Sequence, residues 1–365
     1  MANRNIIKSN NAIVAVQNTS EAFFTTPKSL NLYNLVQGGN YSVSYDRTRP
    51  KQLGVANYTT EDIFRQPDVA LTFSYIPEPS FQNEVHGQFV SETPTTSWRN
   101  FLGGTLDYST NFYVLNTPNQ EDDALKDITI NGSTGSFPDW EIISFGNCAF
   151  TEYNFSWSVG SIPTVTTSYI CSNLKFDTVP SAGQTTGIQS PAINLQSGNN
   201  NDVSDCHFAF NNGKKDPVLI SPNSTNSNVT LQNLQVGGQA LSGQHFVQGV
   251  DMAVSLNRSS LYGLGSDYAY KRKALLPAQG TFNVSSLVSG LTAGTMTGVL
   301  DSDSSYQFDL VLEGSGKKMI YQIQQAKLVS YNYNLGVNDV MSYDASFIFQ
   351  IDENNGLMIT GTSYS

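Results

Sequence analysis

Several short stretches of the chain alternate hydrophobic and polar residues, as strands with one buried face do. Two stretches show this alternation best, and each is followed by a glycine. The residues predicted to face inward are Tyr153, Phe155, Trp157 and Val159 in the first stretch and Val329, Tyr331, Tyr333 and Leu335 in the second. The pattern predicts a mainly β protein whose strands carry one buried side and one side toward solvent.

A longer segment is also repeated within the chain. Residues 36–55 align without a gap with residues 247–266, and eight of the twenty positions are identical at an offset of 211. The stretches 153–159 and 329–335 align instead at an offset of 176, so the first copy contains 35 additional residues between its early and late strands. A repeat of this length is typical of a whole small domain rather than a solenoid unit.

The repeat and the local composition suggest four regions. The linker assignment depends on its composition, because 27 of its 50 residues are Ser, Thr, Asn, Gln or Gly. The predicted regions are an N-terminal arm (1–29), a first β-domain (30–180), a polar linker or insertion (181–230) and a second β-domain (231–365). Within the extra residues of the first copy, Thr95 to Gly104 is predicted to form one short helix with a Thr or Ser cap and a glycine stop.

Composition and charge narrow the classes of function. Of 365 residues, 39% are hydrophobic and 13% charged, which is too apolar for a disordered chain. Nineteen basic and thirty acidic residues give a net charge of −11, which argues against tight binding of phosphates. The three cysteines contain no close pair in sequence, and neither a signal-peptide h-region nor a long apolar span occurs. We therefore expect folding in a reducing compartment, without secretion or a membrane span.

No motif for catalysis or for binding a cofactor or metal is evident. The histidines, His86, His207 and His245, do not fall in a triad or nucleophile-elbow context. The run that begins at Asp301 departs from a calcium loop, because its sixth residue is Tyr306 rather than glycine. The acidic run around residues 121–127 is typical of an exposed loop. The sequence thus predicts a protein that is not an enzyme and has no cofactor and no metal.

Residues 35–55, the strand around residues 69–75 and the closing strands 150–176 resemble a bacteriophage major tail tube protein. The resemblance is to the tubes of long, flexible-tailed phages whose tube domain is duplicated within one chain. It implies two homologous β-sandwich or partly closed barrel domains, each with at most one flanking helix. Since single-domain relatives form hexameric rings, it also implies trimeric rings with pseudo-sixfold symmetry that stack into a channel for DNA ejection.

The resemblance further implies contacts and partners. Inner strands would join between subunits, and a long loop of each copy, residues 45–67 and 256–277, would reach the next ring. The residues expected in ring-stacking or inter-subunit loops are Arg47, Arg49, Lys51, Glu61, Asp62, Arg65, Arg258, Lys271, Arg272 and Lys273. The expected partners are other copies of the chain and the tape measure, terminator and distal tail proteins. Genomic DNA would pass through the lumen without specific binding, in a virion tail assembled in the host cytoplasm.

Two alternatives remain open at this point. One is another tail component of the same fold, such as a tube-initiating or distal ring protein. The other is a carbohydrate-binding β-sandwich adhesin, which Trp98, Trp140, Trp157 and the 18 tyrosines favour because aromatic rings stack on sugars. Trp157 is nevertheless predicted to lie in the core, because it alternates with Phe155 and Val159.

Overall fold

The alternation around Tyr153 forms the end of a long strand, β9 (Glu141–Ser158). Tyr153, Phe155 and Trp157 are buried, as predicted, whereas Val159 lies beyond the end of the strand and is exposed. The computed structural model describes residues 12–18, 31–45, 47–48, 53–54, 62–63, 68–78, 83–84, 99–100, 110–116, 141–178, 188–189, 206–207, 228–236, 239–240, 246–262, 269–287, 305–314, 317–334, 342–351 and 357–361. Among these residues the protein is mainly β, with only residues 83–84 helical.

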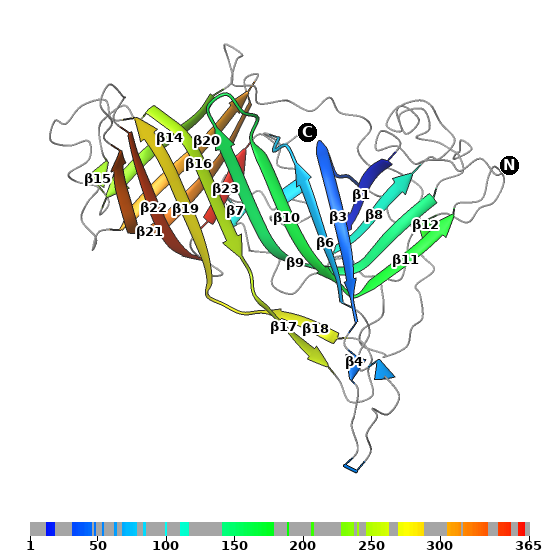
Figure 1. Ribbon diagram of the computed structural model, residues 1–365. Helices are drawn as coiled ribbons and strands as arrows, with labels where there is room; N and C mark the ends of the chain where they lie inside the picture. Colours follow the sequence, from blue (N-terminus) through cyan, green and yellow to red (C-terminus); the bar gives the residue numbers. More distant parts are fainter. Residues whose placement is uncertain are drawn as a thin grey trace.

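Eight antiparallel strands form one continuous sheet, which we call the front sheet (Figure 1). Four strands come from each copy of the repeat, and the two sets meet where β9 pairs with β16. In spatial order the strands are β3 (Val36–Ser44), β6 (Asp68–Tyr75), β10 (Thr164–Cys171), β9, β16 (Phe246–Ser255), β19 (Ala278–Leu287), β22 (Ser342–Ile351) and β21 (Lys317–Asn334).

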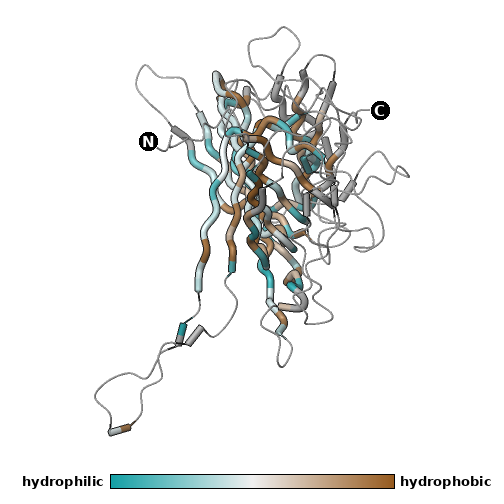
Figure 2. Tube along the Cα trace, turned by 90° about the vertical axis from the view of Figure 1, so that its right-hand side faces the viewer, coloured by the Kyte–Doolittle hydropathy of each residue, from teal (hydrophilic) through white to brown (hydrophobic). Residues whose placement is uncertain are grey.

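Each copy has a second sheet behind the front sheet. The first back sheet is β2 (Asn31–Leu32), β1 (Ala12–Asn18), β8 (Thr110–Asn116), the start of β9 and β11 (Asn173–Thr178). The second back sheet is β15 (Gln239–Ala240), β14 (Asn228–Val236), β20 (Tyr306–Gly314), the start of β21, β23 (Leu357–Gly361) and β7 (Arg99–Asn100). Figure 2 shows from the side that hydrophobic positions gather between the layers.

Three two-stranded hairpins complete the described elements. They are β4 (Arg47–Thr48) with β5 (Asp62–Ile63), β17 (Arg258–Tyr262) with β18 (Ala269–Ala274), and β12 (Ile188–Gln189) with β13 (Cys206–His207). The first two occupy the same place in the two copies, between β3 and β6 and between β16 and β19.

Strands β9 and β21 each pass from a back sheet into the front sheet. Each is 18 residues long and has one residue with positive φ where it leaves the back sheet: Asn147 (φ 51°) in β9 and Gln325 (φ 54°) in β21. The left-handed backbone at these two residues bends the strand, so that one strand can pair in both layers. Each copy is therefore a two-layer β unit connected through one bent strand.

One expectation about local structure, the helix near residue 100, is wrong for the residues that the structure describes. Arg99 and Asn100, expected in a helix spanning Thr95 to Gly104, form strand β7, because their backbone groups pair with β23 of the other copy. Residues 12–18, expected in an N-terminal arm, form β1, which pairs along its whole length with β8 and buries Val16. The remainder of both segments lies outside the described residues.

Gly280 lies where β19 crosses the Phe349 ring of β22. A Cβ atom at residue 280 would fall on that ring, 2.8 Å from Cε1 and closer still to two other ring atoms. We expect Gly280→Ala to lower the free energy of unfolding by about 1–3 kcal/mol, because the buried ring has to shift in a packed core. Urea denaturation measures this, with Gly38→Ala as control, since a Cβ at Gly38 has no neighbour within 4 Å. Equal midpoints for the two variants would show that the ring moves without cost.

Candidate assembly interface

The contact between the two copies is a β-ladder within the front sheet. Strand β9 of the first copy pairs with β16 of the second, so that Tyr153 lies opposite Val254 and Phe155 opposite Met252. All four side chains are buried between the layers. We call this ladder the internal junction. Most of it is main-chain pairing and an apolar inner side, which are the features by which separate chains also extend a sheet.

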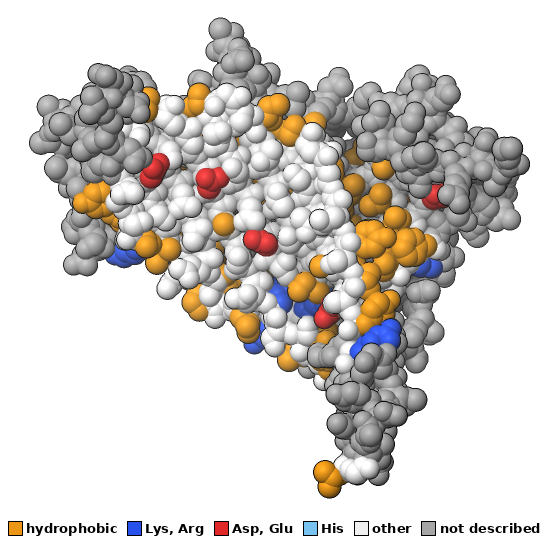
Figure 3. Space-filling view, viewed as in Figure 1, with side chains coloured by type: hydrophobic (Ala, Val, Ile, Leu, Met, Phe, Trp, Pro, Cys, Tyr) orange, Lys and Arg blue, Asp and Glu red, His pale blue; other side chains and the backbone are white. Residues whose placement is uncertain are grey.

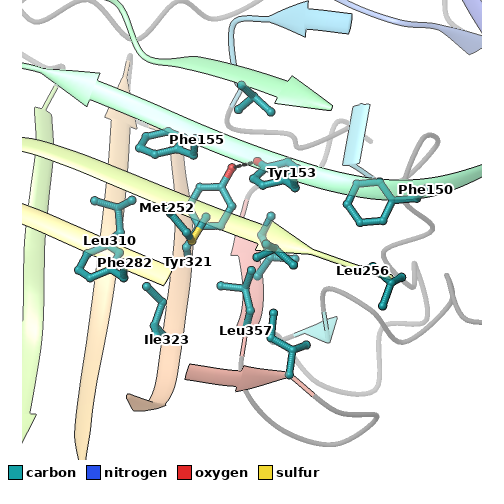
Figure 4. Packing of buried hydrophobic residues seen from close by; sticks show 14 of the residues in the cluster. Phe150, Tyr153, Phe155, Met252, Leu256, Phe282, Leu310, Tyr321, Ile323 and Leu357 are labelled. Atoms are coloured by element: carbon teal, nitrogen blue, oxygen red, sulfur yellow. Dashed lines mark hydrogen bonds between the residues drawn. The ribbon is translucent and has the colours of Figure 1, made fainter. Parts of the chain in front are cut away.

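Aromatic side chains of the first copy fill the space between the two layers of the second. The ring of Phe155 lies 5.7 Å from that of Tyr321 on β21, and the hydroxyl of Tyr321 is 2.5 Å from the hydroxyl of Tyr153 (Figure 4). Figure 4 shows Met252 beside these rings. Neighbouring aromatic rings at such distances add to the free energy of burying their surface.

A buried carboxyl group contacts the internal junction through Tyr153. Glu84 Oε1 accepts hydrogen bonds from the hydroxyls of Tyr75 (2.9 Å) and Tyr153 (3.2 Å), so the bond between Tyr153 and Tyr321 is donated by Tyr321. The pKa of Glu84 is raised from 4.5 to about 7, chiefly by burial and also by the nearby Glu78, against the lowering effect of the two hydroxyl donors and of a backbone hydrogen bond. Burial also raises the pKa of the three tyrosines well above the ordinary value, which keeps them as donors.

The ladder register confirms that the first strands of the two copies are equivalent. At the offset of 211 seen in the sequence, Gly39 opposite Phe73 corresponds to Val250 opposite Val284. The irregularity in the ladder also recurs, because both ladders skip one residue, Gln37 in one and its counterpart Gln248 in the other. A β-bulge kept at the same position marks two strands with the same local geometry.

The late strands are equivalent at a different offset from the one aligned in the sequence. Thr167 pairs with Phe73 and Tyr153, and Ala345 pairs with Val284 and Tyr331, so β10 corresponds to β22 and β9 to β21 at an offset of 178. The bulges at Thr151 and Val329 and the bends at Asn147 and Gln325 are also 178 residues apart. The alignment at 176 is therefore wrong by two residues, which a pattern with a period of two cannot detect.

The two ends of the front sheet carry the same strands as the internal junction. Strand β3 at one end is the counterpart of β16, and β21 at the other is the counterpart of β9. The positions that are buried in the internal junction are open here, since Tyr41 is 42% exposed where Met252 is 1% exposed. Likewise Tyr331 is 45% exposed where Tyr153 is fully buried. Exposed sheet edges with apolar side chains are ready sites for pairing with another chain.

Val329 and Tyr331 were expected to face inward, and this expectation is wrong in the single chain. Val329 is 57% exposed. The alternation in the sequence is present, but β21 pairs with β22 alone in this part of its length, so no described strand covers its other side. The hydrophobic pattern therefore indicates a strand suited to burial on an edge that stays open.

An apolar groove of about 650 Å³ runs beside β3, between the front sheet and the first back sheet. Its lining includes Gly39 and Tyr41 from β3 and Ile143 and Phe145 from β9. These residues are the counterparts of Val250, Met252, Tyr321 and Ile323, between which Tyr153 and Phe155 pack in the second copy. The groove is therefore the counterpart of a space that the internal junction fills, and Figure 3 shows hydrophobic side chains along this border of the front sheet.

The outer face of the front sheet is polar and poor in positive charge (Figure 3). The eight strands of the front sheet are fully described. Within the front sheet they contain a single Lys or Arg, Lys327, which lies where β21 enters the sheet. Three carboxylates on this face accept hydrogen bonds from neighbouring hydroxyl or amide groups. The pairs are Ser156–Asp251 (2.6 Å), Ser285–Asp344 (2.5 Å) and Asn154–Glu152 (2.9 Å).

Two of the residues predicted for contact loops bridge the copies inside the chain. Arg258 Nε donates to the carbonyl of Phe150 at 2.6 Å, and Arg272 forms an ion pair of 2.8 Å with Asp68. Arg47 lies in β4 with its guanidinium 5.6 Å from the centre of the Tyr45 ring. Of the other predicted residues, Asp62 lies in β5 and Lys271 and Lys273 in β18, while Arg49, Lys51, Glu61 and Arg65 lie outside the described residues.

The sequence did not indicate two other features. Cys148 and Cys171, distant in sequence, lie side by side as free buried thiols, and burial raises the pKa of Cys148 well above its ordinary value. Their proximity follows from the pairing of β9 with β10, which the spacing of cysteines cannot reveal. Glu84 was also missed, because a single glutamate among polar residues has no distinguishing pattern.

The remaining chemical candidates add no site. No group of three or more His, Cys, Asp or Glu among the described residues could hold a metal ion. The acidic runs at residues 121–127 and 301–303, together with His86 and His245, lie outside those residues. In the part of the chain that is described, no helix has the length and apolar character needed to cross a membrane. In comparisons with known proteins, no protein-family model and no curated protein matches the chain.

Proposed function

We propose that this chain is a structural subunit that polymerises into a hollow tube, the tail tube of a long-tailed bacteriophage through which DNA is ejected. The observation that carries the proposal is the internal junction together with its unfilled counterparts at the two ends of the front sheet. An edge β21 of one chain and an edge β3 of the next can pair as β9 and β16 do. The sheet then continues from chain to chain.

Repetition of one junction generates a closed ring when the rotation per unit divides a full turn. Each chain contributes two equivalent units, so a ring of three chains has six of them, in agreement with the pseudo-sixfold symmetry that the resemblance implies. Closure would also remove the two open edges, which are an aggregation hazard in a single chain. The groove beside β3 would receive Tyr331 of the neighbouring chain, the counterpart of Tyr153.

The outer face of the front sheet suits the lumen of such a tube. DNA binds proteins chiefly through contacts of Lys and Arg with phosphates, and each contact slows its release. A face of hydroxyls, amides and a few carboxylates, with Lys327 at its border, offers little for phosphates to bind. The back sheets would then form the outer wall, and the tape measure, terminator and distal tail proteins would be the partners inside the tube and at its ends.

Negative-stain electron microscopy and sedimentation velocity of the purified chain at several concentrations test the proposal. We expect hollow tubes or rings, with a ring mass of three times the chain mass of 39.8 kDa. A chain that stays monomeric at every concentration, also with other tail proteins supplied, would contradict it. A role as tube-initiating or distal ring predicts rings that never stack. Glycan binding by the monomer would favour the adhesin, although Trp157 is buried, as predicted, and offers no stacking face.

A further inference from the structure

Arg258 of the second copy binds a backbone carbonyl of β9 at the internal junction. Its Nε atom donates to the carbonyl of Phe150 at 2.6 Å, and its Nη1 atom donates to the carbonyl of Arg272 in its own hairpin at 3.0 Å. Beside it, the backbone N–H of Leu256 donates to the carbonyl of Thr151 at 2.7 Å. A single guanidinium thus joins a carbonyl of the first copy to the hairpin of the second.

The carbonyl that Arg258 binds lies next to a bulge. Thr151 is the extra residue of β9 in its ladder with β10, between the pairs Ser168–Glu152 and Tyr169–Phe150. A bulge interrupts the regular pattern of ladder bonds and re-aims the neighbouring groups. A charged donor at this point satisfies such a carbonyl with a bond stronger than one between neutral groups.

The chain carries a second set of the same parts at its open edges. Arg47 is the counterpart of Arg258, and Arg47 opposite Ile63 in the β4–β5 hairpin corresponds to Arg258 opposite Ala274, each at an offset of 211. On β21, the bulge at Val329 is the counterpart of Thr151, and Leu328 is the counterpart of Phe150. The arginine and its acceptor carbonyl are both present, at opposite ends of one molecule.

We propose that the guanidinium of Arg47 binds the backbone carbonyl of Leu328, next to the bulge of β21, in a second copy of this chain. This inference rests on the proposed function and names the contact that fixes the junction between chains. The exposed Tyr45, counterpart of Leu256, places its backbone N–H toward the carbonyl of Val329 in the same arrangement. Because the bulge occurs once in the strand, the contact also sets the register of the two edges.

Arg47 is the charged contact that the repeat retains. Within the chain a second one exists, the ion pair between Arg272 and Asp68. At the counterpart positions the sequence has Glu61 and Gln279, which cannot form an ion pair. The junction between chains therefore depends on Arg47 more than the internal junction depends on Arg258.

The test uses a cysteine pair as a reporter of the junction between chains. Since Leu256 donates to β9, ladder bonds alternate so that Ala253 and Asn154 form a non-hydrogen-bonded pair with close side chains. Their counterparts are Ser42 and Asn332. We expect Ser42→Cys/Asn332→Cys to crosslink between chains under mild oxidation into species ending at three chains, whereas Ser44→Cys/Asn334→Cys, four residues out of register, does not crosslink.

In the Ser42→Cys/Asn332→Cys variant, Arg47→Ala is expected to raise the chain concentration needed for half-maximal crosslinking at least about 10-fold. This is the effect expected when one hydrogen bond from a charged group is lost. Lys175→Ala, which removes the same charge from the first back sheet, is expected to leave it unchanged. If Arg47→Ala crosslinks at the wild-type concentration, or if Arg47→Ala and Lys175→Ala lose crosslinking equally, the proposed role of Arg47 is wrong while the proposed tube is not contradicted. If the Ser42→Cys/Asn332→Cys variant with Arg47 retained does not crosslink between chains, the proposed function is wrong.

Discussion

Val43→Pro is expected to yield a folded chain that no longer assembles at the concentration at which the wild type does. Val43 lies on β3 and is the counterpart of Val254, which lies opposite Tyr153 in the internal junction. Leu256 donates to β9, and N–H groups of alternate residues point to the same side, so those of Val254 and its counterpart Val43 point away from β6 and β19. Proline at Val43 therefore removes a donor that only a second chain would use, as proline on edge strands commonly does.

The loss of one ladder hydrogen bond, about 1–3 kcal/mol at each junction between chains, is about a 5- to 150-fold rise in the concentration required for assembly. Sedimentation velocity measures the fraction in rings, and circular dichroism measures the fold. Val254→Pro is the matched control, because the same change in the middle of the front sheet breaks a bond within the chain and is expected to lower the free energy of unfolding by about 1–3 kcal/mol. Rings formed by Val43→Pro at the wild-type concentration would show that β3 is not the assembly edge.

The sequence predicts the strands and the duplication of this fold well, for reasons visible in particular residues. Tyr153, Phe155 and Trp157 are buried as their alternation indicates, because a strand with one buried face has a period of two. The offset of 211 is correct through β3, its bulge and the β4–β5 hairpin, because identical residues anchor the alignment there. Both the alternation of residues and the identity of aligned residues can be read from one stretch of sequence, without knowing which strands pair.

Features that depend on pairing between distant strands could not be predicted. The exposure of Val329 and Tyr331 depends on which strand, if any, covers β21, and their own alternation does not contain that information. The error of two residues in aligning β21 with β9 has the same origin, since a shift by one period leaves every side chain on the same face. The candidate interface arises from such pairings. Arg47 and Arg258 are identical positions of the repeat and were expected in contact loops, but only the hairpin register and the bond from Arg258 to Phe150 show which contact such an arginine makes.

Glu84→Gln is expected to remove a loss of stability that the wild-type chain shows as pH rises. The folded-state pKa of Glu84 is about 7, above the ordinary value of 4.5, because burial disfavours the carboxylate. Between these values the folded chain retains a proton that the unfolded chain releases. The stabilising contribution is therefore complete below pH 4.5 and is lost as pH rises through about 7, a change of about 3 kcal/mol.

Urea denaturation at a series of pH values between about 4.5 and 8 measures this difference. Glutamine keeps an acceptor oxygen for the hydroxyls of Tyr75 and Tyr153, so the variant is expected to be the more stable protein above pH 7 and to have the flatter profile. Glu152→Gln removes a carboxylate from the outer face of the front sheet and controls for the change in net charge. Parallel profiles for the wild type and Glu84→Gln would show that burial does not hold the proton.

The same experiment separates the internal junction from the junction between chains. Glu84 reaches the second copy through Tyr153 and Tyr321, and the counterpart of Tyr321 in the groove beside β3 is Ile143, which has no hydroxyl. A neighbouring Tyr331 in that groove would therefore have no equivalent of the Tyr153–Tyr321 bond. We expect the unfolding of each chain to depend on the protonation of Glu84 while the dissociation of rings does not. A pH profile for ring dissociation that Glu84→Gln flattens would contradict the equivalence of Tyr321 with Ile143.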